Sequence, residues 1–292
     1  MAESAIPVDL FNPGQVFACL GFMELADALL GDVEAGFEWS DSKQAKFCLS
    51  AAGENNPFEV VLDFLKTATV KPFRPAGVDG EWPQDAVETV EFPARLSELR
   101  DSTGKKLTAS ALPILLESHG QKFSVSNWLE GDAREGLKLF AGQQVAAKLM
   151  ANVLFGDTTK RGTVGLRQLS PPPGEPFKAA PVGGRFGYDS SGAWDALNTG
   201  FSIDEQGMTL LVSPAVEALA AVGLEHTRPE FPSTYEIRYV AWQGKIPVSL
   251  ARAVFTQPHG LMPRGHFRCF RSHLGDDKQY KKCFPANEEL SK

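Results

Sequence analysis

The sequence predicts an α+β protein: helices mixed with short, mostly antiparallel strands, in one composite domain or two packed lobes. Three observations lead to this class. Apolar residues recur at helical spacing after capping residues, several short runs have strand character, and a Gly/Pro-rich stretch divides the chain near its middle. With 292 residues, 43% of them hydrophobic, the chain can bury a sizeable core.

The predicted helices are marked by their first residues. Asn12 can cap the first of them, with proline next and Gln15 where a capping box places Glu or Gln. Asn56 and Ser213 stand before prolines in the same way. The helices expected from these starts, and from apolar periodicity elsewhere, cover residues 13–30, 57–68, 134–155, 213–224 and 248–255.

Strands are expected where β-rich or alternating residues occur between these helices. The turn at 118–121 can join two of them as a hairpin. Residues 71–83, which contain three prolines, and the tail from Gln257 onward are expected to be irregular. The expected strands are 36–40, 45–50, 87–92, 110–117, 122–131, 185–190 and 234–242.

Charge is distributed unevenly along the chain. The formal net charge is −7, yet residues 1–100 alone carry 7 basic and 17 acidic side chains. Residues 134–185 carry 8 basic and 3 acidic side chains, and residues 245–282 carry 8 and 2. A polyanion senses local potential, which is screened beyond roughly 8–10 Å at physiological salt. The acidic total therefore does not exclude a nucleic-acid binder.

This gradient suggests a division of the chain into three parts. We expect an acidic α+β lobe at 1–156 and a C-terminal α+β lobe with a basic tail at 185–292. Between them, residues 157–184 are rich in Gly, Pro and basic residues and are expected to form a flexible loop. Charges interrupt the long apolar runs, the first residues lack a signal-peptide layout, and four cysteines make no disulfide framework. We therefore expect a cytoplasmic protein without a membrane span.

No catalytic motif stands out. The chain lacks a P-loop, a Gly-x-Ser-x-Gly elbow and a His-Glu-x-x-His pair. Acidic residues of the first third, among them Glu24 and Asp27, are expected to form a solvated rim. The main enzyme-like alternative is a zinc site, because some spacings in the tail suit a zinc ligand set. Interleaved arginines favour a basic surface over that site, whose candidate ligands are His259, His266, Cys269, His273 and Cys283.

Basic residues mixed with aromatics are suited to binding nucleic acid. Lysine and arginine neutralise phosphates, and aromatic rings or guanidinium planes stack on exposed bases. Such residues gather in the 157–184 loop and in the tail, where Phe267 and Phe270 alternate with arginines. Composition alone leaves open whether these are nucleic-acid contacts or solvated faces.

Four segments together resemble a known family. They are IPVDLFNPGQVFACLGFMELADALLG (6–31), KLFAGQQVAAKLMANVLFG (138–156), FGYDSSGAWDALNTGFS (186–202), and SPAVEALAAVGLEHTRP followed by YEIRYVAW (213–242). They resemble a protein of subtype I-G (formerly I-U) CRISPR–Cas loci, a short large-subunit-type component of the Cascade effector complex. The matching stretches cover roughly a third of the chain directly, and the tail beyond about residue 250 matches less clearly.

The resemblance implies a subunit with no catalytic residues, cofactor or metal. It would bind target double-stranded DNA near the protospacer-adjacent motif and support recruitment of a separate helicase-nuclease, while guide pairing reads the sequence. Its partners would be the backbone subunit, the guide-processing subunit and the guide RNA. A protein-only scaffold subunit of the same complex remains an alternative, as does a metal-dependent nuclease.

On this reading, basic residues of both positive windows would contact the nucleic-acid backbone. Gln143 and Gln144 could read bases, or they could simply be polar residues on a helix surface. The expected backbone contacts are Lys160, Arg161, Arg167 and Arg185 from the central loop, and Arg264, Arg268, Arg271, Lys281 and Lys282 from the tail.

Overall fold

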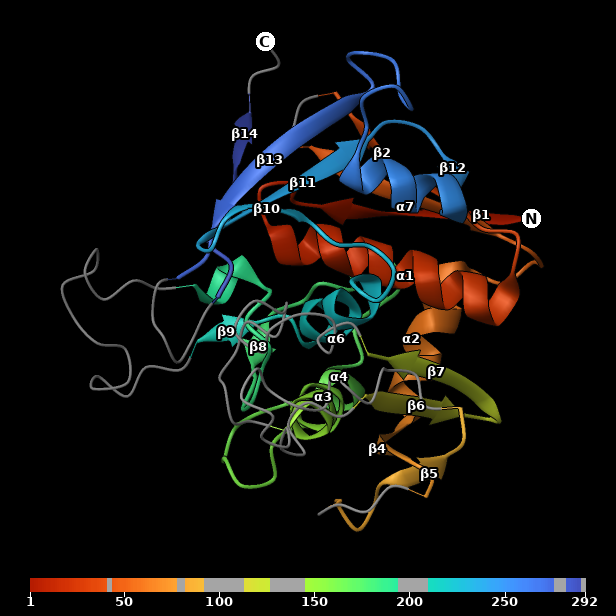
Figure 1. Cartoon of the computed structure of the whole chain (residues 1–292), viewed down its shortest axis with the longest axis vertical. Helices are drawn as coiled ribbons and strands as arrows, with labels where there is room; N and C mark the ends of the chain where they lie inside the picture. Colours follow the sequence, from red (N-terminus) through yellow and green to blue (C-terminus); the bar gives the residue numbers. More distant parts are fainter. Residues whose placement is uncertain are drawn as a thin grey trace, which may run out of the picture.

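The protein has the predicted α+β architecture, in which the described residues form helices and four small, mostly antiparallel sheets (Figure 1). Helix α1 (Pro13–Leu30) runs through the centre, with strands and a helix of the C-terminal part on one side and helix α6 (Pro214–Gly223) on the other. A computed structural model describes residues 1–40, 44–77, 82–91, 113–126, 145–193, 210–275 and 282–289.

Helix α1 begins as its sequence predicts. The Asn12 side chain accepts a hydrogen bond from the Gln15 amide at 3.4 Å, and Gly31, at φ 77°, ends the helix. The predicted capping box is wrong in its partner, because Gln15 Oε1 accepts from the Asp9 amide at 2.8 Å rather than from Asn12. The Gln15 side chain thus binds the chain at Asp9, three residues before the helix cap.

By length and composition, α1 could cross a membrane, contrary to the expectation that no helix of the chain could. However, 72% of this apolar window is buried inside the protein. Cys19 is fully buried within it. The helix therefore has the surroundings of a core helix.

The first sheet lies against α1 in the order β1-β3-β2-β12. Its cross-strand row Ile6–Phe47–Phe37 is fully buried, so one face of the sheet belongs to the core. The strands expected at 36–40 and 45–50 are confirmed, and two further strands complete the sheet. Their bounds are β1 (Ala2–Val8), β2 (Glu34–Trp39), β3 (Ala45–Ala51) and β12 (Ile246–Pro247).

The second sheet corrects the expectation of an irregular tail. Residues of the tail form β13 (Phe267–His273), which pairs with β11 (Glu236–Trp242) over seven residues, from Glu236↔His273 to Trp242↔Phe267. Its sequence shows no clean alternation, because the adjacent residues Cys269 and Phe270 are both buried and Arg268 and Arg271 lie on opposite faces of the strand. The strands, in the order β10-β11-β13-β14, are β10 (Glu230–Ser233), β11 (Glu236–Trp242), β13 (Phe267–His273) and β14 (Asn287–Glu289).

The third sheet corrects the loop expected at 71–83. The strand at 69–75 pairs with two neighbours. Pro72 is its last residue paired with the strand at 114–118, and Pro75 is its last residue paired with the strand at 87–89. At these ladder ends a missing N–H costs little. The hairpin expected through 118–121 is confirmed, and its turn residues His119 and Gly120 both have positive φ. The order is β5-β4-β6-β7, with β4 (Thr69–Pro75), β5 (Val87–Thr89), β6 (Ile114–Ser118) and β7 (Gln121–Val125).

The remaining helices largely follow the prediction. The helices at 57–68, 213–224 and 248–255 are confirmed as α2 (Pro57–Thr67), α6 and α7 (Val248–Thr256). Of the helix expected at 134–155, the structure describes α3 (Ala146–Phe155), and residues 134–144 lie outside the described part.

The expected central loop contains short regular elements, α4 (Leu166–Leu169) and β8 (Ala180–Pro181), and β8 pairs with β9 (Leu211–Val212). Leu166 is fully buried, so part of the segment belongs to the core. The strand expected at 185–190 is wrong. This backbone instead directs amide groups at a buried carboxylate and ends in the 3₁₀ turn η4 (Ser190–Gly192).

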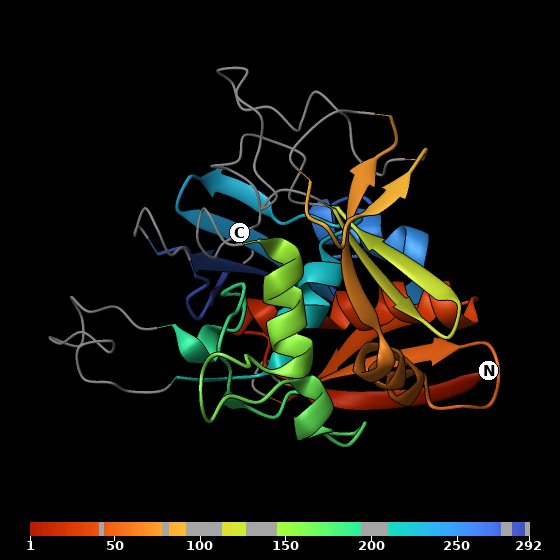
Figure 2. The ribbon, with the colours of Figure 1, turned by 90° about the horizontal axis from the view of Figure 1, so that it is seen from below.

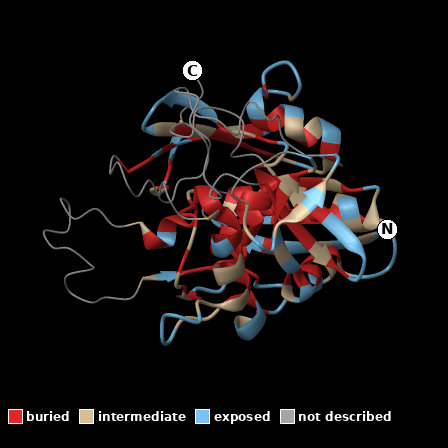
Figure 3. Ribbon diagram, turned by 60° about the horizontal axis from the view of Figure 1, so that its bottom comes forward, coloured by how far each residue is buried: buried red, intermediate tan, exposed pale blue. Residues whose placement is uncertain are grey.

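Helices α1 and α6 approach so closely that glycine is required at their crossing. A Cβ atom at Gly21 would overlap the Leu219 carbonyl, and one at Gly223 would overlap the Phe17 carbonyl. Every residue of α6 is buried, and buried residues gather at the centre of the fold (Figure 3). The buried residues form one cluster that includes Ile6, Leu149, Leu219 and Phe270, so elements from both halves of the chain share it.

Candidate nucleic-acid interface

The residues expected to contact nucleic acid fall into two structurally different groups. The first group follows α3. Lys160 and Arg161 are exposed on the turn at 157–163. Asp157 orders this turn, since its Oδ1 accepts from the Thr159 amide at 2.9 Å and from the Thr159 hydroxyl at 2.6 Å. Thr163 Oγ1 closes it by donating to the Asp157 and Lys160 carbonyls. The two cations thus project from a hydrogen-bonded turn.

Arg167 lies on α4, next to this turn. Its side chain is exposed, and its guanidinium carbon lies over the Phe155 ring, 4.4 Å from the centroid. Arg167 Nε donates to the Lys66 carbonyl at 2.5 Å. A ring and a carbonyl therefore hold the guanidinium in place.

Arg185 has a different environment. It is half-buried, and its Nη2 donates to the Gly192 carbonyl at 3.4 Å. Burial raises the pKa of the nearby Glu217, and the charge of Arg185 counteracts part of that rise. The contacts of Arg185 are thus with the protein interior.

Arginines of the second group face glutamates across the second sheet. Arg268 Nη1 lies 3.4 Å from Glu288, and Arg271 Nε donates to Glu289 Oε1 at 2.8 Å. Arg238, on the neighbouring strand, donates to Glu289 Oε2 at 2.5 Å. These pairs tie β14 to the sheet, a use of the tail arginines that the sequence analysis missed.

The other predicted contacts are placed as follows. Arg264 is exposed in the turn between α7 and β13, and Lys282 is half-buried just before Cys283. Gln143, Gln144 and Lys281 lie outside the described residues.

The alternative zinc ligands do not form a ligand cluster. Among the residues that the structure describes, no three His, Cys, Asp or Glu side chains gather as a metal site would require. Instead, His259 packs edge-on against Phe267, and His273 lies beside Tyr235 and Phe284. Cys283 is fully buried. These two histidines therefore pack against aromatic rings, and Cys283 belongs to the core.

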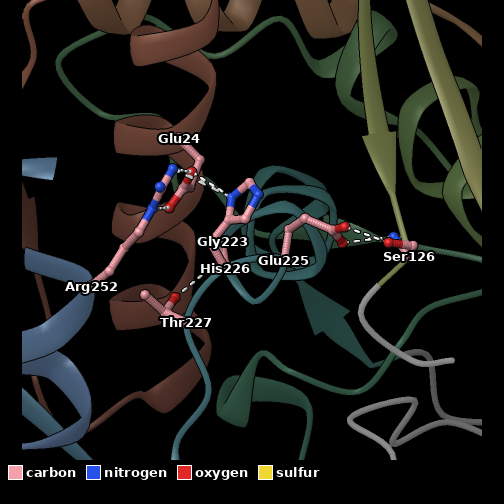
Figure 4. Close-up of polar contacts among 7 residues, drawn as sticks. All are labelled: Glu24, Ser126, Gly223, Glu225, His226, Thr227 and Arg252. Atoms are coloured by element: carbon pink, nitrogen blue, oxygen red, sulfur yellow. Dashed lines mark hydrogen bonds and ion pairs between the residues drawn. The ribbon is translucent and has the colours of Figure 1, made fainter. Parts of the chain in front are cut away.

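A buried ion cluster occurs where a solvated rim was expected. Glu24, on α1, is 2% exposed. Its carboxylate accepts from Arg252 Nε at 2.8 Å and from Arg252 Nη2 at 2.5 Å, and lies 2.8 Å from His226 Nδ1 (Figure 4). Next to His226, Glu225 accepts from the amide and hydroxyl of Ser126. The cluster joins α1, α7 and the chain after α6, and it corrects the expectation for Glu24.

The cluster makes stability depend on pH. Burial alone would raise the pKa of Glu24, but the hydrogen bonds and charges of His226 and Arg252 hold it below its ordinary value. The hydrogen bond to Glu24 raises the pKa of His226 above its ordinary 6.5. A raised histidine pKa stabilises the fold below the unfolded value, and the stabilisation is lost as pH rises through the folded value.

We therefore expect His226→Gln to lower the free energy of unfolding by at most about 1 kcal/mol in mildly acidic solution, since His226 is half exposed. The difference from wild type should be largest just below about pH 6.5, where His226 is protonated and Glu24 is still ionised, and should shrink as pH rises. Urea unfolding at several pH values measures this, with exposed His266→Gln as the control. A difference that grows with rising pH would contradict the charge pairing.

A second buried network links three distant segments. Glu217, on α6, is fully buried and accepts from the amides of Phe186 at 2.6 Å, Gly187 at 2.8 Å and Asp189 at 2.9 Å. Asp189 in turn accepts from Asn12 Nδ2 at 2.8 Å and from the Ser213 amide at 2.7 Å. Both carboxylates have their oxygens satisfied by donors, which is the arrangement of a structural network.

Comparison of the chain with protein-family models, curated proteins and solved structures finds no match. The candidate interface is therefore described from the geometry of this chain alone. It consists of exposed cations on the turn after α3 and on α4, together with Arg264, whereas the arginines of the second sheet are engaged with glutamates.

Proposed function

We propose that this chain is a non-catalytic subunit of a type I-G Cascade surveillance complex. In this role it binds target DNA near the protospacer-adjacent motif and supports recruitment of the helicase-nuclease in antiviral defence. It acts in the cytoplasm with the backbone subunit, the guide-processing subunit and the guide RNA.

The observation that carries the proposal is a hydrogen-bonded network between segments that resemble the family. Asn12 belongs to the first, Asp189 to the third, and Ser213 with Glu217 to the fourth. These four residues are joined in one hydrogen-bonded network, although Asn12 and Asp189 are 177 positions apart. Three of the four resembling segments are thus joined by hydrogen bonds into one structural unit, as expected if they mark a common fold.

The charged surface also supports nucleic-acid binding. Lys160, Arg161 and Arg264 are exposed, and no ion pair of theirs is found among the described residues. Exposed cations on ordered turns neutralise phosphates without first breaking a protein contact.

Two alternatives have less support. A protein-only scaffold would leave these exposed cations without a role beyond solubility. A metal-dependent nuclease needs carboxylates or histidines grouped around a cation, and the described part of the chain groups no three of them.

Copurification tests the proposal directly. We expect the tagged full chain, expressed with the other proteins and the repeat–spacer array of a type I-G locus, to retain guide RNA and elute with the other subunits. A metal-dependent nuclease would instead cut DNA alone in a divalent-dependent manner. Elution of the chain by itself, without guide RNA, would reject the proposal.

A further inference from the structure

The two basic windows of the chain differ in what their cations already contact. On the second sheet, Arg238, Arg268 and Arg271 are paired with Glu230, Glu236, Glu288 and Glu289. A phosphate bound there would have to displace a carboxylate and leave it beside the new anion. The pairing therefore disfavours backbone contacts on this sheet.

The side of the protein around α3 and α4 is different. Lys148, Lys160, Arg161 and Arg167 are all exposed there, and we call these four residues the α3–α4 surface. Asp157 is an acidic group near them, and its hydrogen bonds with Thr159, followed by the charges of Lys160 and Lys148, lower its pKa. Figure 2 views this side, with α3 in light green and the turn at 157–163 following it. Positive charge thus predominates on the α3–α4 surface.

Arg167 adds a geometric feature to this charge. Phe155 lies beneath its guanidinium, and Nε is committed to the Lys66 carbonyl. The exposed side of the guanidinium is therefore held in place before any ligand arrives. A guanidinium plane fixed in this way is a stacking surface for an unpaired base.

Resting on the proposed function, we infer that the α3–α4 surface binds single-stranded nucleic acid. Arg167 stacks on an unpaired base, and Lys160 and Arg161 contact the adjacent phosphates. Paired bases inside a duplex cannot use the stacking surface, because neighbouring bases cover their faces. An opened target or a guide segment offers both unpaired bases and backbone phosphates.

Binding of fluorescent oligonucleotides to the full chain, measured over a salt series, tests this. A single-stranded oligothymidine should bind at least about tenfold more tightly than a duplex of equal length. Arg167→Lys keeps the charge but removes the plane, so it should weaken single-strand binding about tenfold and leave the salt slope unchanged. Lys160→Ala/Arg161→Ala should reduce the slope by about 1.4, or about 0.7 per lost phosphate contact.

Arg268→Lys is the matched control, because Arg268 also lies over a ring, that of Trp39 at 5.2 Å, but is paired with Glu288. It should leave binding unchanged. Equal effects of Arg167→Lys and Arg268→Lys, or equal affinity for single strand and duplex, would overturn the inference. If the full chain binds no single strand while the complex containing it retains guide RNA, this inference fails and the proposed function stands.

Discussion

Replacing Glu217 by alanine is expected to lower the free energy of unfolding by about 3 kcal/mol or more, since each buried donor left without a partner costs about 1–3 kcal/mol. The carboxylate accepts three backbone amides in a fully buried site. Burial raises the pKa of Glu217, while the amides of Asp189 and Gly187 and the charge of Arg185 counteract the rise. Urea unfolding, with an unchanged m-value, measures the loss.

Glu217→Gln refines this prediction. Its remaining oxygen can accept from Phe186 and Gly187, whereas its amide group would face the donor of Asp189. We expect a smaller loss than for alanine. The matched control is Glu59→Ala, because Glu59 also occupies a first helical turn but is exposed, so its loss should stay below about 1 kcal/mol. Equal losses at the two sites would contradict a structural role for the buried carboxylate.

Gly21→Ala is expected to destabilise the protein by about 2–3 kcal/mol, the upper range for overpacking of a core. Within a helix, this substitution normally stabilises by about 1 kcal/mol. The sign reverses here because the new Cβ would overlap the Leu219 backbone of α6. Thermal unfolding reports the difference, with Gly174→Ala as a control in open space. A stabilised Gly21→Ala protein would show that α1 and α6 do not cross as described.

The parts of the fold that were predicted correctly rest on local chemistry. Asn12 and Ser213 cap helices through residues three positions away, and the 118–121 hairpin is determined by its own turn. Errors arose where distant residues decide the outcome. Pro72 lies in a strand because β6 pairs beside it.

The candidate site shows the same limit. The positions of Lys160, Arg161 and Arg264 on turns follow from nearby Gly and Pro residues. The engagement of Arg271 by Glu289, by contrast, depends on strand pairing across 18 positions. Glu24 gave no local sign of burial, because its partner Arg252 is 228 positions away. A charge count can locate a basic window but cannot say which of its charges are already paired.

Target-DNA affinity of the guide-loaded complex, assembled with and without this chain, tests the central claim most directly. Measured over a salt series on DNA carrying the flanking motif, the complete complex should bind more tightly and with a steeper salt dependence than the complex lacking the chain. The affinity lost on omission should also depend on the flanking motif. Equal affinity and equal salt slope for the two assemblies would contradict a DNA-binding role and leave the protein-only scaffold as the explanation.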